Sequence, residues 1–169
     1  MQIGLIGGIG PAATDFYYRS LIEKFASEDA DLDMTIVHAD ASTLVKNLMD
    51  DNKDAQVSIY NGLTKRLKNA GAECVAITSI AGHFCIEKFV AKSVLPIVDL
   101  LSCVRAEVEN KGYEKIGILG TKPVMESKFY SVIKSAEIVL PEGDLLEDVH
   151  NAYVEMATSG HASEDQKLV

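Results

Sequence analysis

The chain repeats one local pattern, in which a short apolar run ends in a turn rich in glycine or hydroxyl residues and a helical pattern follows. The clearest example is GAECVAITSIAGH at residues 71–83, where the run that begins at Cys74 stops at Thr78 and the helical pattern starts after Gly82. MQIGLIGGIGPAAT, at the start of the chain, has the same order. Apolar runs of this kind are typical of parallel strands that are buried on both faces. The alternation predicts an α/β fold in which a parallel sheet has helices on both faces.

The same pattern gives the expected elements and lobes. Strands are expected at residues 2–6, 34–39, 74–78, 94–98, 115–119 and 137–140. Helices are expected at residues 11–26, 42–51, 53–69, 82–92, 100–110, 124–135 and 144–158, and the polar tail from residue 159 is expected to fray. KIGILGTKPVMES, from residue 115, repeats the opening strand, glycine turn and proline. This repeat predicts a first lobe at 1–114 and the start of a second, incomplete lobe at 115–169.

The acidic composition limits which partners fit. The net charge is −9 and the pI is about 4.9, which argues against nucleic acid because phosphate binding requires basic patches. A small acidic ligand remains compatible, since amides at a helix start bind carboxylates despite a repulsive net charge. No apolar run approaches the ~20 residues that span a bilayer, and the chain enters a strand at once with no signal-peptide pattern. We therefore expect a cytoplasmic protein that binds no membrane.

The three cysteines, Cys74, Cys85 and Cys103, indicate neither a disulfide framework nor a metal site. Their number is odd and they form no CxxC pair, whereas structural zinc sites use closely spaced pairs. Cys74 lies in an apolar strand and Cys85 in a helical pattern, so we interpret both as small buried side chains. No bound metal is expected.

The turn after the first strand has three interpretations. GIGPAA at residues 8–13 matches GxGxxA, the dinucleotide-binding fingerprint in its alanine form. That fingerprint also requires an acidic residue about 20 positions on, whereas Asp40 lies roughly 30 positions on. The second interpretation is a tight turn that needs glycine for its backbone angles. The third, which fits best, is a set of helix-start amides that faces a carboxylate or a phosphate.

Polar residues at the end of the third strand have both structural and functional interpretations. Thr78 and Ser79 can donate hydrogen bonds to a ligand or cap a helix, and their place at a strand end favours the ligand role. His83 follows them and is either a structural group or a site residue.

Two further strand ends carry charged residues. Asp40, after the second strand, can bind an ammonium group or cap the turn before Thr43. Thr121 and Lys122 follow the strand at 115–119 and repeat the arrangement with an added cation. Lys122 is interpreted either as an anion contact or as a solvated surface side chain.

Four collinear blocks of the chain resemble the Asp/Glu/hydantoin racemases, and the aspartate racemase branch in particular. GLIGGIGPAATDFYYRSLIE resembles the start of that branch, and GAECVAITSIAGH resembles its GA-D/E…C-N-T-x-x-H segment. KIGILGTKPVMESKFY resembles the opening of the second lobe, and PEGDLLEDVHNAYVEMATSG resembles the strand, turn and helix that follow. The resemblance covers essentially the whole chain. It implies two pseudo-symmetric α/β lobes with the active site between them, and a racemase that requires no cofactor.

The resemblance also implies how the chemistry is divided. In this family each lobe supplies one cysteine, and the two thiols remove a proton from one face of the α-carbon and return it on the other. The first cysteine position falls on Thr78, whose hydroxyl is a poor base near neutral pH. The second cysteine belongs to a later G-C-T-E strand that lies past the end of this sequence. By the same resemblance, the residues that bind the substrate are Ile9, Gly10, Asp40, Ser79, His83, Thr121 and Lys122.

Two functions of different classes follow, both for a small acidic amino acid or dicarboxylate. The first is racemisation by two-base proton transfer, and the second is a non-catalytic binding module of racemase ancestry, which the threonine at position 78 favours. A nucleotide-binding Rossmann domain ranks below both because its acidic residue is misplaced. A homodimer is expected. The resemblance implies one because members of the family pair as dimers, and an incomplete second lobe leaves apolar surface that a second copy would cover.

Overall fold

The computed structural model describes residues 1–127, 129–159 and 163–167. The chain forms two compact units, Met1–Asp99 and Leu100–Val169. The boundary between the two units lies after Asp99, whereas the internal repeat predicts a boundary after residue 114. The boundary lies earlier because the helix that starts at Leu100 packs within the second unit. The division of the repeat into lobes stays a prediction.

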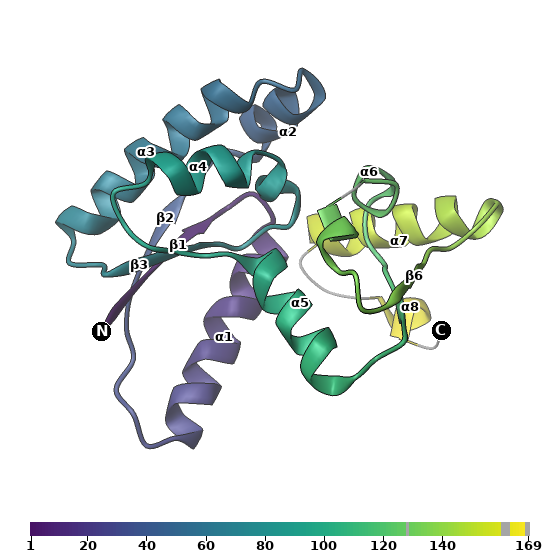
Figure 1. Cartoon of the computed structure of the whole chain (residues 1–169), viewed down its shortest axis with the longest axis horizontal. Helices are drawn as coiled ribbons and strands as arrows, with labels where there is room; N and C mark the ends of the chain where they lie inside the picture. Colours follow the sequence, from purple (N-terminus) through teal and green to yellow (C-terminus); the bar gives the residue numbers. More distant parts are fainter. Residues whose placement is uncertain (128, 160–162, 168–169) are drawn as a thin grey trace. The chain divides into compact units, whose positions relative to one another are not determined.

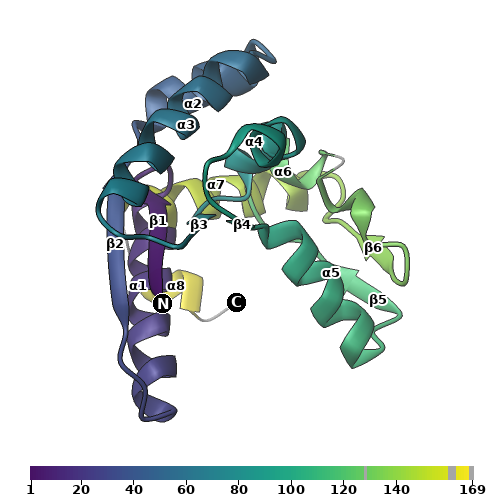
Figure 2. The same cartoon turned by 60° about the vertical axis from the view of Figure 1, so that its left-hand side comes forward.

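The first unit is built on a parallel sheet (Figure 1), and the order of its strands is β2-β1-β3-β4 (Figure 2). Its strands are β1 (Gln2–Gly7), β2 (Asp33–His38), β3 (Cys74–Ile77) and β4 (Ile97–Val98). Gly7 pairs with His38 and Ile6 pairs with Ile77, so β1, β2 and β3 end at the same edge of the sheet. This confirms the expected parallel sheet and brings the loops that follow the three strands together.

Helices cover both faces of this sheet, as the sequence pattern predicts. Helix α1 (Pro11–Ser27) lies on one face, and α3 (Lys53–Asn69) and α4 (Ile86–Lys92) lie on the other (Figure 1, Figure 2). Helix α2 (Ala41–Met49) packs on α3. The hydrophobic core of the unit lies between α3, α4 and the sheet.

Two aromatic side chains form the centre of this core. Tyr60 on α3 and Phe89 on α4 are both completely buried, and their ring centroids are 5.1 Å apart. Val57 and Leu67, one turn before and two turns after Tyr60, are buried on the same side of α3. Their spacing gives the helix the apolar stripe that packs on the sheet.

The second unit holds a shorter parallel pair, β5 (Lys115–Gly117) and β6 (Glu137–Val139). The other elements of this unit are α5 (Leu100–Lys111), α6 (Lys122–Met125), η2 (Phe129–Val132), α7 (Asp144–Ser159) and α8 (Glu164–Lys167). Met125 and Ile133 are buried.

The prediction of a single helix at 124–135 is wrong, because α6 ends at Met125 and a separate 3₁₀ turn, η2, begins at Phe129. Ser127 accounts for the break. Its Oγ donates to the Val124 carbonyl oxygen at 2.6 Å and accepts from the Phe129 amide at 3.3 Å. A serine that bonds the local backbone in this way competes with the hydrogen bonds that would continue a helix.

Two other expectations need smaller corrections. The helix expected at 82–92 begins as a 3₁₀ turn, η1 (Ala81–Cys85), in which the His83 amide bonds the Ile80 carbonyl oxygen at 2.9 Å. The tail expected to fray from residue 159 contains α8. The rest of that expectation, at residues 160–162 and 168–169, lies outside the described residues. Within the described ranges, no helix combines the length and the apolarity that crossing a membrane requires.

Gly8 and Gly62 provide a matched test of the glycine turn. Gly8 has a φ of +91°, and a Cβ there would lie 2.3 Å from Nδ1 of His38, whereas a Cβ at Gly62 in α3 would meet nothing within 4 Å. We expect Gly8→Ala to lower the free energy of unfolding by at least about 1–3 kcal/mol. Gly62→Ala should raise it by up to about 1 kcal/mol, because alanine favours a helix interior. Urea unfolding of both variants measures this, and equal effects of the two would contradict the described turn.

Candidate functional site

The edge at which β1, β2 and β3 end gathers the residues that the sequence assigns to a site in the first unit. These residues are Ile9 and Gly10 after β1, Asp40 after β2, and Thr78, Ser79 and His83 after β3. The parallel register of the strands brings the three loops together. Thr121 and Lys122 belong to the second unit.

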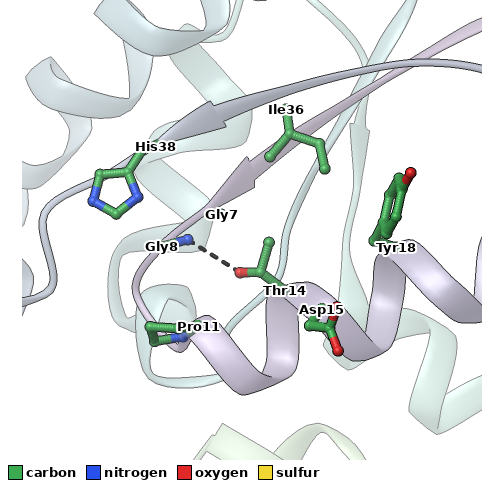
Figure 3. A pocket seen from close by; sticks show the side chains of 8 residues that line it. All are labelled: Gly7, Gly8, Pro11, Thr14, Asp15, Tyr18, Ile36 and His38. Atoms are coloured by element: carbon green, nitrogen blue, oxygen red, sulfur yellow. Dashed lines mark hydrogen bonds between the residues drawn. The ribbon is translucent and has the colours of Figure 1, made fainter. Parts of the chain in front are cut away.

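Thr14 on α1 ties the glycine turn to the end of β3. Its Oγ1 accepts a hydrogen bond from the Gly8 amide at 3.1 Å (Figure 3) and lies 3.0 Å from the carbonyl oxygen of Gly10. The same atom is 2.9 Å from Oγ1 of Thr78. One hydroxyl therefore holds two points of the glycine turn and the residue that ends β3.

Thr78 is completely buried, and its polar atoms are engaged inside the protein. Its Oγ1 donates a hydrogen bond to the Ile6 carbonyl oxygen at 3.3 Å, and its amide donates to the same oxygen at 3.1 Å. The Thr14 and Thr78 hydroxyls also form a hydrogen bond with each other. Each hydroxyl has one proton to donate, and each finds its acceptor within this group of bonded residues. The Thr78 side chain therefore acts as a structural link between strands β1 and β3 and helix α1.

His83 is also buried, with 2% of its surface exposed. Its Nδ1 donates to the Ser79 carbonyl oxygen at 2.7 Å, which is the only role open to it because a carbonyl oxygen can only accept. Its Nε2 lies 3.8 Å from Oδ1 of Asp99. Burial lowers the pKa of His83, although the Ser79 carbonyl and the Asp99 charge oppose the shift. The imidazole is therefore neutral near pH 7.

Asp40 caps helix α2, which is one of the two roles that the sequence leaves open. Its Oδ1 accepts from the Thr43 amide and from the Ser42 hydroxyl, each at 2.7 Å. These hydrogen bonds lower the pKa of Asp40 to about 2. The carboxylate is exposed and remains charged, so capping does not prevent it from meeting an ammonium group.

Two amides and one hydroxyl at this edge form no hydrogen bond within the described part of the chain. Among the described residues, no hydrogen bond uses the amide of Ile9 or of Gly10, which immediately precede helix α1. Ser79 is partly exposed and directly follows Thr78. Helix-start amides and a hydroxyl are groups that bind a carboxylate.

A pocket of about 350 Å³ opens beside this edge, between α1 and β2 (Figure 3). The residues that line it are Gly7, Gly8, Pro11, Thr14, Asp15, Tyr18, Ile36 and His38. The lining of the pocket is largely apolar, and its Tyr18 and Ile36 side chains are 43% and 41% exposed. The volume of the pocket is at the lower end of the range for small-ligand pockets. Thr14 borders both this pocket and the edge that carries Thr78.

In the second unit, Lys122 forms an ion pair with Glu147 on α7. Its amide also donates to Nδ1 of His150 at 3.1 Å. The Glu147 carboxylate raises the pKa of Lys122, and Lys122 in turn lowers the pKa of Glu147. Thr121 precedes α6 and accepts the amides of Val124 and Met125 with its carbonyl oxygen. A ligand anion at Lys122 would have to share the ammonium group with Glu147.

The three thiols differ in exposure. Cys85 is buried, and burial raises its pKa to about 11, so it holds its proton near pH 7. Cys74 is half-buried within β3, and Cys103 is exposed on α5. Across the described ranges, no three His, Cys, Asp or Glu side chains are grouped so as to hold a metal ion.

The sequence interpretation missed three residues that matter at this edge. Thr14 carries a local signal, because a hydroxyl four residues after Gly10 can reach back to the turn. His38 closes the pocket beside Gly8, and Tyr60 donates to the carbonyl oxygen of Gly82 at 3.2 Å. Those two roles depend on tertiary packing and have no local signal.

Comparison with known proteins points to one family. The Asp/Glu/hydantoin racemase family model matches residues 6–166. An aspartate racemase homologue from Pyrococcus horikoshii OT3 is similar at 25% identity and a TM-score of 0.82, over 99% of this chain and 76% of that one.

Two more distant structures share the fold. The aspartate racemase of Picrophilus torridus is similar at 20% identity and a TM-score of 0.68, over 94% of this chain and 72% of that one. The glutamate racemase of Aquifex pyrophilus is similar at 17% identity and a TM-score of 0.59, over 92% of this chain and 66% of that one. These matches confirm the α/β racemase fold.

Asp40 can be tested by separating its cap from its charge. Asp40→Ser keeps a side-chain oxygen that caps a helix but removes the carboxylate, whereas Asp40→Ala removes both. If Asp40 only caps α2, the serine variant should keep both the stability and the ligand affinity of the unmodified chain. If it also binds an ammonium group, the serine variant should unfold normally but bind an amino acid more weakly. Thermal unfolding and calorimetric titration with L-aspartate distinguish the two, and we expect the second result.

His83 predicts a pH dependence of stability. Its pKa in the folded chain lies below the usual 6.5, so the unfolded chain binds the proton first as the pH falls. The free energy of unfolding should therefore be highest above pH 6.5 and should decrease as the pH is lowered from about 6.5 toward the folded pKa. Urea unfolding between pH 5 and 8, the range over which histidine titrates, measures this slope. The slope should persist in His38→Gln, at an exposed histidine, and disappear in His83→Gln; a slope unchanged in His83→Gln would contradict the assignment.

Proposed function

This chain belongs to the Asp/Glu/hydantoin racemase family, and from that premise we propose that it binds a small acidic amino acid or dicarboxylate without racemising it. The observation that carries the proposal is the state of Thr78. This residue stands at the first cysteine position by resemblance, is completely buried, and bonds the Ile6 carbonyl oxygen and the Thr14 hydroxyl.

Racemisation by proton transfer requires a base on each face of the α-carbon. A threonine hydroxyl holds its proton far more tightly than a thiol does, and it becomes nucleophilic or basic only beside a second base. The groups that touch the Thr78 hydroxyl are a carbonyl oxygen and another hydroxyl. Neither is a base of the required strength, so residue 78 lacks the means to remove a proton.

Two neighbouring groups could replace the missing base, and the geometry disfavours both. His83 is neutral, which suits a base, but its side chain is fully enclosed and its ring is held between Ser79 and Asp99. Cys85 is buried and its raised pKa keeps it protonated. A general base must come within about 3 Å of the proton that it removes, and neither side chain is exposed to a ligand at the strand edge.

The binding half of a site is better supported. The amides of Ile9 and Gly10 are suited to one carboxylate of the ligand, and the partly exposed Ser79 can donate to the same group. The charged Asp40 is suited to the α-ammonium group. Thr121 and Lys122 are the contacts that the resemblance assigns to the second unit. This set uses only groups of the chain itself, and we expect that no cofactor takes part.

Hydrogen exchange at the α-carbon tests the proposal directly. The chain is incubated with L-aspartate or L-glutamate in deuterium oxide, and the α-proton signal of the amino acid is followed by NMR. We expect no incorporation of deuterium and, in a separate panel of dicarboxylates and amino acids, a rise in the melting temperature with aspartate. Thr78→Cys is the matched variant, because exchange by that variant alone would locate the missing base at residue 78.

Two results would contradict the proposal. Exchange by the unmodified chain would show that another group acts as a base, and loss of that exchange in His83→Gln would identify His83. A melting temperature that no acid raises would argue against the binding function. A rise with NAD or NADP instead would favour the nucleotide-binding interpretation of the glycine turn.

A further inference from the structure

The pocket between α1 and β2 is separate from the groups that we assign to the acidic ligand. Of the residues proposed to bind that ligand, none lines the pocket. Its lining comes from the end of β1, the first half of α1 and the second half of β2 (Figure 3). Gly8 and Thr14 belong both to this lining and to the hydrogen bonds of the glycine turn. The pocket is therefore a second cavity that adjoins the strand edge.

Glycine at residue 7 shapes the floor of the pocket. A Cβ there would lie 2.5 Å from Cγ2 of Thr14 and 3.3 Å from Cγ2 of Ile36, so the absence of a side chain lets both methyl groups approach the backbone of β1. The floor consists of these methyl groups and the bare backbone of Gly7 and Gly8. Helix α1 covers this floor only in part, since none of its own residues is fully buried.

Two side chains with large apolar surfaces form the walls. Tyr18 of α1 and Ile36 of β2 lie on two sides of the pocket (Figure 3), and both leave apolar surface in contact with water. A ring placed between them would remove this surface from water and could stack on the Tyr18 ring. The walls therefore favour a planar aromatic group.

The polar groups of the lining favour a cation. Asp15 is the one carboxylate among the lining residues, and neither a lysine nor an arginine is among them. Arg19 donates to Oδ2 of Asp15 at 2.8 Å, which leaves Oδ1 without a hydrogen bond to any described residue. The Tyr18 hydroxyl and the His38 ring form no such bond either. Because Asp15 lies three residues before Tyr18 on the helix, the carboxylate and the ring are neighbours on its surface.

Size and charge together select the class of ligand. A volume of about 350 Å³ has room for one small ring system and not for a helix or strand of a partner protein. A carboxylate in the pocket would be repelled by Asp15, and the net charge of −9 adds to the repulsion. An ammonium group can instead pair with Oδ1 of Asp15 and lie near the Tyr18 ring, which attracts a cation.

We propose that this pocket is a binding site for a small aromatic amine. The ring of the ligand lies between Tyr18 and Ile36 on the bare backbone of the floor, and its ammonium group pairs with Asp15. The site goes beyond the proposed function, because the strand edge is assigned to a carboxylate and this pocket to a cation. Neither site depends on the other.

Tryptamine is the probe, because it joins one fused aromatic ring system to one ammonium group. Indole-3-propionate carries a carboxylate on the same ring system, and 2-cyclohexylethylamine carries the ammonium group without an aromatic ring. Binding of each compound to the full chain is measured by calorimetric titration. Amide signals of the ¹⁵N-labelled chain, followed by NMR during the titration, locate the bound compound.

Two matched pairs of variants test the two contacts. Asp15→Asn removes the carboxylate of the pocket, whereas Glu23→Gln removes an exposed carboxylate of α1 that is outside the lining. Tyr18→Ala removes the aromatic wall, whereas Phe16→Ala removes an exposed aromatic ring of α1 that is outside the lining. All four positions are exposed, so the variants should keep the fold.

We expect tryptamine to bind and to shift the amide signals of Gly7, Gly8 and Thr14, and both other compounds to bind more weakly. Asp15→Asn should weaken tryptamine binding roughly fivefold, the effect of losing one exposed ion pair. Tyr18→Ala should weaken it roughly tenfold, the effect of losing an aromatic contact. Glu23→Gln and Phe16→Ala should bind tryptamine as the unmodified chain does.

An absence of tryptamine binding would overturn the proposal, and so would binding of indole-3-propionate that is as tight as that of tryptamine. Equal losses in a variant and its matched control, or signal shifts confined to Ile9, Gly10 and Ser79, would also overturn it, because the amine would then bind elsewhere. If Tyr18→Ala fails to fold, Asp15→Asn decides the question. A chain that binds tryptamine but no aspartate would contradict the proposed function and support this site.

Discussion

The contact between the hydroxyls of Thr14 and Thr78, at 2.9 Å, is the interaction on which the candidate site depends. The parallel register brings the ends of β1 and β3 together, but it does not determine how the glycine turn lies against β3. Thr14 does so, because the same oxygen accepts the Gly8 amide and meets Thr78. A buried hydroxyl pair of this kind is stable only when both groups are satisfied, and the Ile6 carbonyl oxygen completes the set.

This contact has a chemical consequence. A thiol at residue 78 would be larger, a weaker hydrogen-bond donor and far more readily ionised than a hydroxyl. Threonine instead gives a residue that stabilises the turn and has no basicity near neutral pH. The fold of the racemase family is thus retained, with a strand end that is suited to hold a binding loop. The amides of Ile9 and Gly10 beside it form no hydrogen bond with any described residue, which is why we propose binding and not proton transfer at this edge.

The sequence alone predicted the parts of the structure that depend on local pattern. The apolar runs at residues 2–6 and 74–78 predict strands of a parallel sheet, and the structure has them at Gln2–Gly7 and Cys74–Ile77. Gly8 needs its glycine for its backbone angle, which is one of the three interpretations that the sequence left open for this turn. The break at Ser127 could not be predicted, because its hydroxyl bonds the backbone of a segment whose side-chain periodicity is helical. The roles of Tyr60 and Asp99 could not be predicted either, because each depends on a partner far along the chain. Tyr60 bonds Gly82, 22 residues away, and Asp99 lies beside His83, 16 residues away. For Asp40 the sequence left two roles open, and the structure shows the cap.

A crystal structure of the chain with L-aspartate would test the central claim most directly. The account predicts that a ligand carboxylate lies within hydrogen-bonding distance of the Ile9 and Gly10 amides. It also predicts that Thr78 keeps its contacts with Ile6 and Thr14, with its hydroxyl turned away from the α-carbon of the ligand. A Thr78 hydroxyl that has left Thr14 and points at that α-carbon would contradict the claim that residue 78 has a structural role.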